Sequence, residues 1–423
     1  MDQKILIKQS KIINPDGLHH RQVVDIEILN GTINLISKHI PKDPSHTFIL
    51  ENIPYLSCGW VDTYCELREP GNEIQEDLTT LDKLAKCSGF SHILGHPNTI
   101  PILQKPSDIS FIIEKCQNFQ TRILPFAATS KNFDNSTLTE FFLNKEAGCV
   151  GFSQGKKTYD NVDVLVRALR SAESLGLPVV SSPLEISLAN SFVHESENTL
   201  HLGFKGQPSL AETSVIVQQI EALKYTEGHL HFTGISCKES VEIIRQAKKE
   251  SLNISCDVSI NNLCFTELQI ADYNSLYKTN PPLRTEEDRT SLIAAINDGT
   301  IDCIASYHQP VNQEKKALEI EYAEEGILGL QTFLPMYVKH LANEISLDTF
   351  IDSITKKPQN IFQLEASKIE VGEKANLVGF DLDSEWLYHS KTLHSKVNNH
   401  PYYGQKLKGE IRFTFCRDKF YCK

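Results

Sequence analysis

Apolar and polar side chains largely alternate at both ends of the chain. The alternation covers residues 4–13, 23–37 and 46–53, and Asn30-Gly31 lies inside it at a position typical of a tight hairpin turn. The same character returns after residue 363, over 370–382 and 409–423. We therefore expect a small composite β-sandwich domain formed by residues 1–53 together with residues 363–423.

The middle of the chain, residues 54–362, follows a different pattern, in which short apolar runs alternate with amphipathic helical stretches. The helical stretches include 78–89, 106–119 and 240–251. The apolar runs predict strands at 55–64, 90–96, 121–129, 148–153, 177–183, 229–236, 253–260 and 301–306. Strands separated by helical crossovers indicate a parallel sheet, and about eight such units predict an α/β fold with a (β/α)8 TIM barrel.

Composition and charge exclude several classes of protein. The chain is 40% hydrophobic and 23% charged, as in ordinary globular proteins, and it has no apolar run near the roughly 18 residues of a membrane span. The N-terminal residues do not resemble a signal peptide. The net charge of −12 is spread without a basic block, which argues against a nucleic-acid partner.

The eleven cysteines are odd in number and contain no CxxC pair. Most of them lie in apolar segments, so we interpret them as reduced, buried side chains of a cytoplasmic protein. Cys65 lies where an expected strand ends, but the neighbouring Glu66 carboxylate raises a thiol pKa and disfavours a nucleophilic role. The chain also lacks a GxxxxGK[ST] loop, a GxGxxG loop after a strand and a GxSxG elbow.

In a barrel of this kind, the functional residues lie at the C-terminal ends of the strands. The segments there include LREPG at 67–71, PNT at 97–99, NPPLR at 280–284, DGTID at 298–302 and GILGLQTFLP at 326–335, with VGEKANLVGFD at 371–381 and LKGEI at 407–411 in the closing β segment. In order and spacing these motifs resemble the dihydroorotases of the amidohydrolase superfamily, specifically the long bacterial type related to the dihydroorotase part of the animal multifunctional enzyme. The resemblance covers essentially the whole chain and implies a role in pyrimidine biosynthesis.

The family's chemistry is metal-assisted hydrolysis, in which Zn²⁺ polarises a carbonyl and lowers the pKa of a bound water. The resemblance places the family's metal ligands on six positions of this chain, which are Tyr64, Glu66, Gln154, Ser182, Gly234 and Tyr307. Only Glu66 is a good ligand, whereas a catalytic zinc normally has three protein ligands. We therefore expect no metal cofactor and no metal-dependent cyclic amidase activity, with Tyr64 and Tyr307 filling the space of the metals.

Several histidines lie near the ends of the expected strands, namely His92, His96, His229, His231 and His308. His92 and His96 span a strand and a loop, so their side chains do not converge as they would on a helix. We interpret these histidines as solvated or hydrogen-bonded side chains rather than as a rebuilt metal site.

Other residues do match the family's substrate positions. Arg68, Asn98, Asn280 and His308 fall where the family holds the carboxylate and ring of dihydroorotate, and an arginine suits bidentate carboxylate binding. Alternatively, Arg68 pairs with Glu66 or Glu69, and the two asparagines cap turns beside prolines. The sequence leaves both interpretations open.

Three functional hypotheses follow. In the favoured one, the chain is a non-catalytic homologue, a pseudoenzyme that serves as a structural or regulatory subunit, as a homodimer or with aspartate carbamoyltransferase. In the second, it is an active dihydroorotase or related cyclic-amide hydrolase with a relocated site. In the third, it is a sensor that binds a small anionic pyrimidine precursor.

Overall fold

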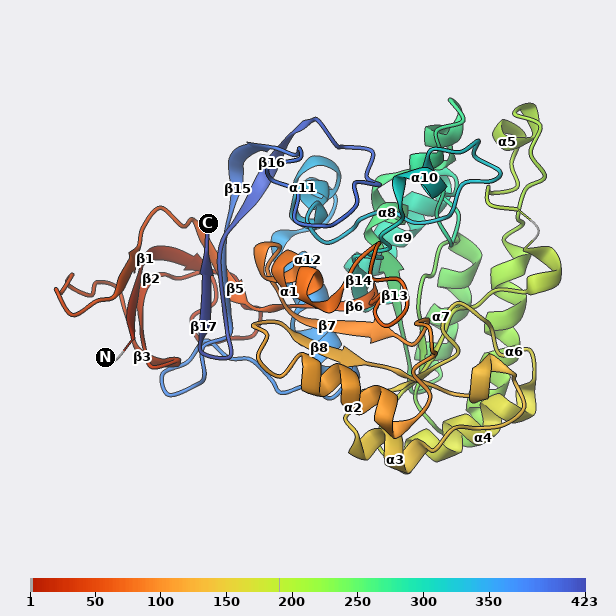
Figure 1. Ribbon diagram of the computed structural model, residues 1–423, viewed down its shortest axis with the longest axis horizontal. Coiled ribbons are helices and arrows are strands. Elements are labelled where there is room, and N and C mark those ends of the chain that lie inside the picture. Colours follow the sequence, from red (N-terminus) through yellow and green to blue (C-terminus); the bar gives the residue numbers. More distant parts are fainter. Residues whose placement is uncertain (1–2, 190) are drawn as a thin grey trace.

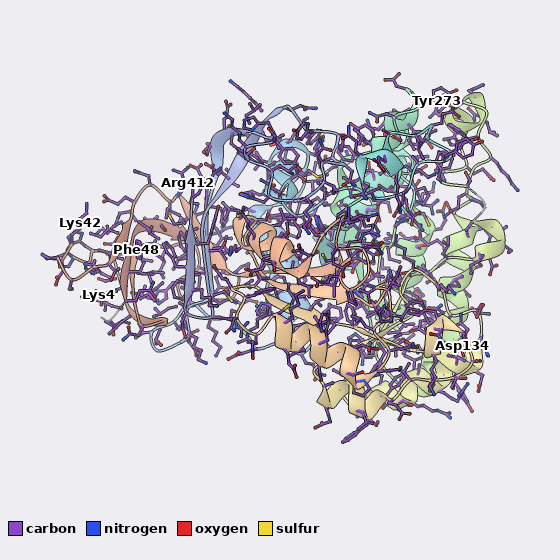
Figure 2. All side chains as sticks on the ribbon, in the orientation of Figure 1. Lys4, Lys42, Phe48, Asp134, Tyr273 and Arg412 are labelled. Carbon is purple, nitrogen blue, oxygen red and sulfur yellow. The ribbon has the colours of Figure 1, made fainter. Side chains whose placement is uncertain are left out.

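The computed structural model describes residues 3–189 and 191–423 and consists of a sheet of terminal strands packed beside a barrel (Figure 1). Figure 2 shows Phe48 on the terminal sheet and Lys42 in the loop that precedes it, with Tyr273 and Asp134 on the far side of the barrel. No helix in these ranges is long and apolar enough to cross a membrane.

The terminal sheet combines strands from both ends of the chain. It contains β1 (Lys4–Ile12), β2 (Val23–Leu29), β3 (Thr32–Ser37), β4 (Phe48–Leu50), β5 (Tyr55–Cys58), β15 (Leu377–Leu387), β16 (Lys406–Cys416) and β17 (Lys419–Cys422). The strand order is β17-β16-β15-β5-β1-β2-β3, and β4 pairs with β1. Because β5 pairs with both β1 and β15, it joins the two terminal segments, and the expected composite β domain is confirmed.

The strands of the barrel pair in parallel, and helical crossovers connect most of them. Its strands are β6 (Trp60–Glu66), β7 (Phe90–His96), β8 (Arg122–Pro125), β9 (Ala127–Ala128), β10 (Phe152–Ser153), β11 (Val179–Ser181), β12 (Leu230–Phe232), β13 (Ile254–Ser259) and β14 (Cys303–Ala305). They form the ladders β6-β7-β8 and β14-β13-β12-β11-β10-β9. The backbone N–H of Glu66 donates to the carbonyl of His308 over 3.1 Å and closes the seam between β6 and the residues after β14. The predicted TIM barrel is confirmed.

Helices cover the outside of the barrel. The longer ones are α1 (Leu78–Cys87), α2 (Pro106–Lys115), α3 (Phe141–Glu146), α4 (Val162–Glu173), α6 (Leu210–Thr226), α7 (Lys238–Lys249), α9 (Glu286–Asp298) and α12 (Leu347–Ile354). The shorter ones are α5 (Glu197–His201), α8 (Ile260–Cys264), α10 (Gln313–Lys316), α11 (Phe333–Met336) and α13 (Lys356–Ile361). Helix α1 shows why they form: Asp77 caps its N-terminus by accepting from the N–H of Thr80, and Leu81 and Leu84 bury its apolar face.

One strand prediction was wrong. The sequence assigned 55–64 to a single barrel strand, but the structure divides it at Gly59, so that β5 belongs to the terminal sheet and β6 to the barrel. A Cβ atom at Gly59 would lie 2.1 Å from Oδ1 of Asn376 and 2.4 Å from Oγ of Ser91. A glycine is therefore needed where the chain passes between the two sheets.

Candidate functional site

Two stacked tyrosines fill the mouth of the barrel. Tyr64 lies near the end of β6 and Tyr307 follows β14, and their ring centroids lie 3.9 Å apart with planes 7° from parallel. They are only 3% and 5% exposed, and burial raises the pKa of both phenols. The cavity beside them has a volume of about 30 Å³, enough for about one water molecule. The two rings thus occupy the mouth, and the expectation that they take the space of the family's metal ions stays a prediction.

The hydroxyl group of Tyr307 lies close to the backbone of Gly234. Gly234 has a φ of 76°, and a Cβ atom there would lie 2.1 Å from the hydroxyl oxygen of Tyr307. That hydroxyl lies 3.1 Å from Oγ1 of Thr233. A side chain at position 234 and a tyrosine at position 307 therefore exclude each other in this arrangement.

Glu66 is held between two cations. Its Oε2 lies 2.8 Å from Nη2 of Arg68, and its Oε1 lies 2.7 Å from Nζ of Lys156, which also contacts Glu325 at 3.3 Å. Burial raises the pKa of Glu66, but the charges of Lys156 and Arg68 outweigh this and hold that pKa below its ordinary value. The carboxylate is thus ionised, buried and internally neutralised.

Beneath the tyrosines lies a polar cluster around Asp257 on β13. The carboxylate accepts from Oγ1 of Thr63 at 2.9 Å, from the N–H of Gly234 at 2.9 Å and from Oγ1 of Thr233 at 3.0 Å, and it lies 3.1 Å from Nε2 of His231. All of these groups are buried. Sequence reasoning missed Asp257, although a carboxylate inside the apolar strand pattern at 253–260 was a signal for a buried partner.

A second buried carboxylate, Asp62 on β6, joins this strand to Ser306, which follows β14. It accepts from the backbone N–H and from the hydroxyl of Ser306, at 2.8 and 2.5 Å. Burial is the main reason that the pKa of Asp62 is raised, to about 7, and the nearby charge of Asp257 adds to it. Both barrel carboxylates are therefore occupied by hydrogen-bond donors of the barrel itself.

The remaining positions of the family's ligand set also have partners within the chain. Oε1 of Gln154 accepts from the N–H of Ser130 at 3.1 Å, and its Nε2 donates to Oδ1 of Asn135 at 2.8 Å. The hydroxyl of Ser182 donates to the carbonyl of Gly155 at 3.0 Å. These contacts anchor loops of the mouth.

The donor set can be tested against the zinc ion that the resemblance implies. Of the six positions, only Glu66 is a carboxylate, and Arg68 and Lys156 already neutralise it. Within residues 3–189 and 191–423, no group of three or more His, Cys, Asp or Glu side chains is placed to hold a metal. A catalytic zinc needs three protein ligands, and the residues as they lie do not fit that ion.

The four substrate-position residues lie around the mouth but do not share an empty space. Arg68 pairs with Glu66, and its Nη1 lies 3.7 Å from Glu324. Oδ1 of Asn98 accepts from the backbone N–H of Lys156 at 3.3 Å. The other two residues lie elsewhere on the rim: Asn280 lines the small cavity, and His308 is fully buried with Nε2 3.7 Å from Glu76. The ion-pair interpretation of Arg68 describes its contacts, and ligand binding by the four residues stays a prediction.

The other histidines do not assemble a new centre. His92 lies 2.9 Å from Oγ of Ser91, and His229 lies 2.9 Å from Oγ of Ser255. His96 stacks beside Tyr64 with ring centroids 4.2 Å apart, and burial lowers its pKa to about 4. The interpretation as solvated or hydrogen-bonded side chains agrees with the contacts of His92 and His229. It is wrong for His96, which is buried and packs against the rings of Tyr64 and Phe126.

The NPPLR motif at 280–284 carries a buried ion pair. Nη2 of Arg284 lies 3.2 Å from Glu212 at the start of α6, and both side chains are at most 3% exposed. Arg284 also donates from Nε to Ser236 at 2.7 Å and lies 3.0 Å from Nδ1 of His194. The motif therefore locks three loops of the mouth together, a role that the sequence did not reveal.

Comparison with known proteins identifies the family. The family model described as "Dihydro-orotase-like" matches residues 55–240, and that of the "Amidohydrolase family" matches residues 160–420. A dihydroorotase from Geobacillus sp. (strain WCH70) is 32% identical over 419 residues, 98% of each chain. One from Aquifex aeolicus (strain VF5) is 32% identical over 414 residues, 97% of each chain.

Solved structures of lower sequence identity share the fold. An L-hydantoinase (dihydropyrimidinase) from Arthrobacter aurescens superimposes with a TM-score of 0.86 at 20% identity, covering 100% of this chain and 96% of that one. A D-hydantoinase (dihydropyrimidinase) from Thermus sp. gives 0.80 at 19% identity, covering 99% and 95%. Sequence and fold agree, and the chain belongs to the dihydroorotase family of the amidohydrolase superfamily.

Proposed function

We propose that this chain acts in the pyrimidine biosynthesis of the cytoplasm as a non-catalytic member of its family, a structural or regulatory subunit without metal-dependent hydrolysis. One observation carries the proposal. The carboxylate of Glu66 is already paired with Lys156 and Arg68, while Tyr307 occupies the space over Gly234. Metal and substrate would both have to displace groups of the protein.

The energetic cost of that displacement supports the proposal. Removing one partner from a buried ion pair costs about 3–5 kcal/mol, because the other charge is left buried without compensation. The cavity beside the two tyrosines also offers only about 30 Å³, whereas small-molecule sites commonly enclose about 300–1,000 Å³. A neighbouring cavity of about 270 Å³ shares Asn280 and Glu325 with it but does not reach Tyr64, Glu66 or Tyr307. Binding a cyclic amide would therefore require the stacked tyrosines to separate.

A second candidate function is dihydroorotase or related cyclic-amide hydrolase activity through a relocated site. The specific observation in its favour is that the matching relatives, at 32% identity over 97–98% of the chain, carry the name dihydroorotase, and the comparisons support this reading more directly than the non-catalytic one. The buried His231–Asp257 pair is the acid–base pair that such a site would use.

Metal content and turnover separate the two candidates. The purified protein would be analysed for zinc and assayed with dihydroorotate and hydantoin, beside the Aquifex aeolicus dihydroorotase as a positive control. We expect well under one equivalent of zinc, no turnover, and the same melting temperature with and without a chelator. Stoichiometric zinc with turnover that a chelator abolishes contradicts the non-catalytic proposal.

A pair of variants distinguishes a relocated site from contaminating activity. If turnover is found, His231→Asn tests the pair, and His229→Asn is its matched control because His229 contacts the same Ser255 but not Asp257. Loss of turnover in the first variant alone supports the relocated site. Equal turnover in both excludes it.

The partner in this proposal is aspartate carbamoyltransferase or a second copy of the chain. Two loops at the mouth, which carry the LREPG and PNT motifs, expose apolar side chains: Ile74 is 81% exposed and Ile100 is 64% exposed. The loops are joined, since the N–H of Ile100 donates to the carbonyl of Pro70 at 2.9 Å. Exposed apolar residues on fixed loops suit a protein interface, and a stable one buries at least about 1,000 Å².

Sedimentation velocity tests the partner, with the chain alone and mixed with the transferase of the same organism. We expect a complex or a homodimer that is weakened in Ile74→Lys and Ile100→Lys. Leu18→Lys is the control, because Leu18 is 74% exposed in a turn of the terminal β domain. A monomer that neither binds the transferase nor changes its activity contradicts this part of the proposal.

A sensor of an anionic pyrimidine precursor is supported by two buried donors at the mouth. Nδ2 of Asn98 and Nε2 of His308 have no hydrogen-bond partner among the described residues. Stabilisation of the protein by dihydroorotate, lost in Asn98→Ala, supports this role. No thermal shift at millimolar dihydroorotate excludes it.

A further inference from the structure

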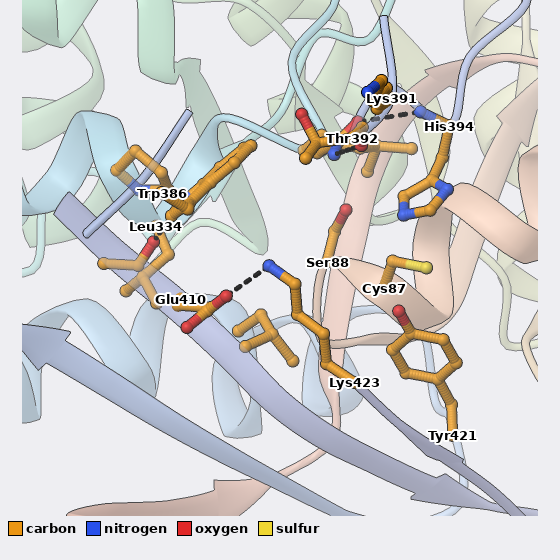
Figure 3. Close-up of a pocket in the computed structure, with 15 residues that line it drawn as sticks. Cys87, Ser88, Leu334, Trp386, Lys391, Thr392, His394, Glu410, Tyr421 and Lys423 are labelled. Atoms are coloured by element: carbon orange, nitrogen blue, oxygen red, sulfur yellow. Dashed lines mark hydrogen bonds and ion pairs between the residues drawn. The ribbon is translucent and has the colours of Figure 1, made fainter. Parts of the chain in front are cut away.

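We propose that a pocket between the barrel and the C-terminal strands binds a small planar carboxylate (Figure 3). The pocket is separate from the barrel mouth and has a volume of about 180 Å³. The end of α1, the start of α11, the hairpin of β15 and β16, and β17 form its walls. The proposal is independent of whether the mouth is catalytic.

The apolar wall of the pocket is centred on Trp386. Leu334 and Ile411 lie beside it, and the indole N–H donates to the carbonyl of Gly409 at 2.8 Å, which fixes the plane of the ring. An apolar cavity of about 150 Å³ is known to hold a benzene molecule. A pocket of about 180 Å³ therefore accommodates one six-membered ring with a carboxylate. It is smaller than the roughly 300–1,000 Å³ of sites that bind drug-sized ligands.

The polar wall of the pocket is positively charged. Three of the lining residues carry basic side chains, Lys391, His394 and Lys423, and Glu410 is the only acid among the lining residues. Glu410 is already paired with Lys423, as Figure 3 shows, and with Arg412 at 2.8 Å. Glu410 is therefore neutralised by its own ion pairs and does not neutralise Lys391.

Lys391 and His394 lack partners of their own. Within the described ranges of the chain, neither the Lys391 ammonium nor the His394 imidazole makes a hydrogen bond or an ion pair with another residue. Burial and the nearby charges of Lys83 and Lys423 lower the pKa of His394, so its imidazole is neutral near pH 7 and offers an N–H donor. The loop is held in place, since Gln331 accepts from the N–H of His394 at 3.2 Å and donates to the carbonyl of Thr392 at 2.6 Å.

These features together define the ligand class. A fixed indole face selects a flat apolar ring, and an unpaired ammonium beside a neutral imidazole N–H selects a single negative charge. Because hydrogen bonds hold the indole ring and the loop of Thr392 and His394 before binding, ordering entropy is lost mainly at the Lys391 side chain. Nζ of Lys423 lies 5.3 Å from the centroid of the Trp386 ring and covers part of it. A phosphate without a ring would leave the rest of the apolar wall without a contact, and a neutral ring would leave Lys391 without a partner.

Tryptophan fluorescence tests the proposal with benzoate as the probe and benzamide as its neutral isostere. Trp60 is fully buried in the core, so Trp386 is the tryptophan that reports on the pocket. We expect saturable quenching by benzoate at millimolar or lower concentration and at least about tenfold weaker quenching by benzamide, a difference of about 1.4 kcal/mol. Inorganic phosphate should not compete at the same concentration.

Variants locate the effect. Lys391→Met combined with His394→Asn should weaken benzoate binding at least tenfold, as measured by calorimetry. Lys406→Met is the control, because Lys406 is an exposed lysine at the start of β16 that does not line the pocket. Equal binding of benzamide, equal weakening by the control, or no saturable quenching by benzoate up to about 10 mM each overturns the proposal.

Discussion

The barrel mouth and the pocket beside Trp386 are both concave and charged, yet their charges are arranged in opposite ways. In the mouth, Glu66 lies between Lys156 and Arg68, and the cavity beside Tyr64 and Tyr307 has a volume of about 30 Å³. In the pocket, Lys391 has no partner among the described residues, and the volume is about 180 Å³. The comparison teaches that charged residues in a cavity indicate a ligand only where the protein has not already paired them.

The physical reason is desolvation. When a buried charge is paired with a neighbouring residue, that ion pair offsets the desolvation free energy of the charge. A ligand would have to break the pair before it could bind to the charge. An unpaired cation at the edge of a pocket gains a new contact when an anion binds. Substitutions in the mouth should therefore mainly change the free energy of unfolding. Substitutions in the pocket should mainly change the affinity for a ligand.

The largest expected effect is at the buried pair that locks the mouth. Arg284→Met leaves Glu212 buried without its cation and should lower the free energy of unfolding by about 3–5 kcal/mol. Urea denaturation measures it. Arg167→Met removes an exposed pair with Asp163 and should change stability by at most about 0.5 kcal/mol. If both variants lowered the free energy of unfolding by similar amounts, the buried ion pair would contribute no more than the exposed one, which contradicts the prediction.

Tyr307→Asp should destabilise the protein by about 2–4 kcal/mol. The substitution opens a cavity beside Tyr64 and places an acid near the charge of Asp257, which already raises the pKa of Tyr307. The melting temperature measures it, with Tyr322→Asp as the control since Tyr322 is 71% exposed. An unchanged melting temperature for Tyr307→Asp would show that the mouth is open and wet.

Gly234 and Tyr307 should be energetically coupled. Gly234→Ala is destabilising because its methyl group meets the tyrosine hydroxyl, and because L side chains rarely adopt its φ of 76°. Tyr307→Phe removes that hydroxyl and should relieve part of the cost. A double-mutant cycle should give a coupling of about 1–2 kcal/mol, and additive effects would contradict the contact.

Lys156→Met should cost about 1–2 kcal/mol near neutral pH, because Glu66 keeps only Arg68 as a partner. The charge of Lys156 helps to lower the pKa of Glu66, so this stabilisation is present above the unfolded-state pKa of about 4.3 and is lost as the pH falls through the lower folded-state value. The difference between the variant and the parent protein should therefore shrink in urea titrations below about pH 4. A constant difference would show that Lys156 contributes by packing instead.

The smallest effect on stability is expected in the pocket. Lys391→Met should change the free energy of unfolding by at most about 0.5 kcal/mol, because its side chain is exposed and has no ion pair among the described residues. The comparison is sharpened if benzoate binding falls in the same variant. A destabilisation like that of Lys156→Met would place Lys391 in the framework instead.

Much of the fold was predictable because local patterns specify it. The apolar run at 90–96 is strand β7 with the same bounds, and the amphipathic stretch at 78–89 became α1 with its cap at Asp77. The strand at 55–64 was misjudged because an apolar run does not reveal which sheet each half joins. The pairing of β5 with β1 and β15, and of β6 with β7, places the two halves in different sheets.

The site shows the same division between sequence and tertiary structure. The family, the barrel and the bulk of Tyr64 and Tyr307 follow from the sequence alone. The folded arrangement is needed to show that Lys156 reaches Glu66, that Asp257 accepts from Thr63 and that Arg284 is buried against Glu212. Each of these pairs joins residues more than 70 positions apart. Contacts between residues so far apart produce no repeating pattern along the sequence, so a single sequence does not predict them.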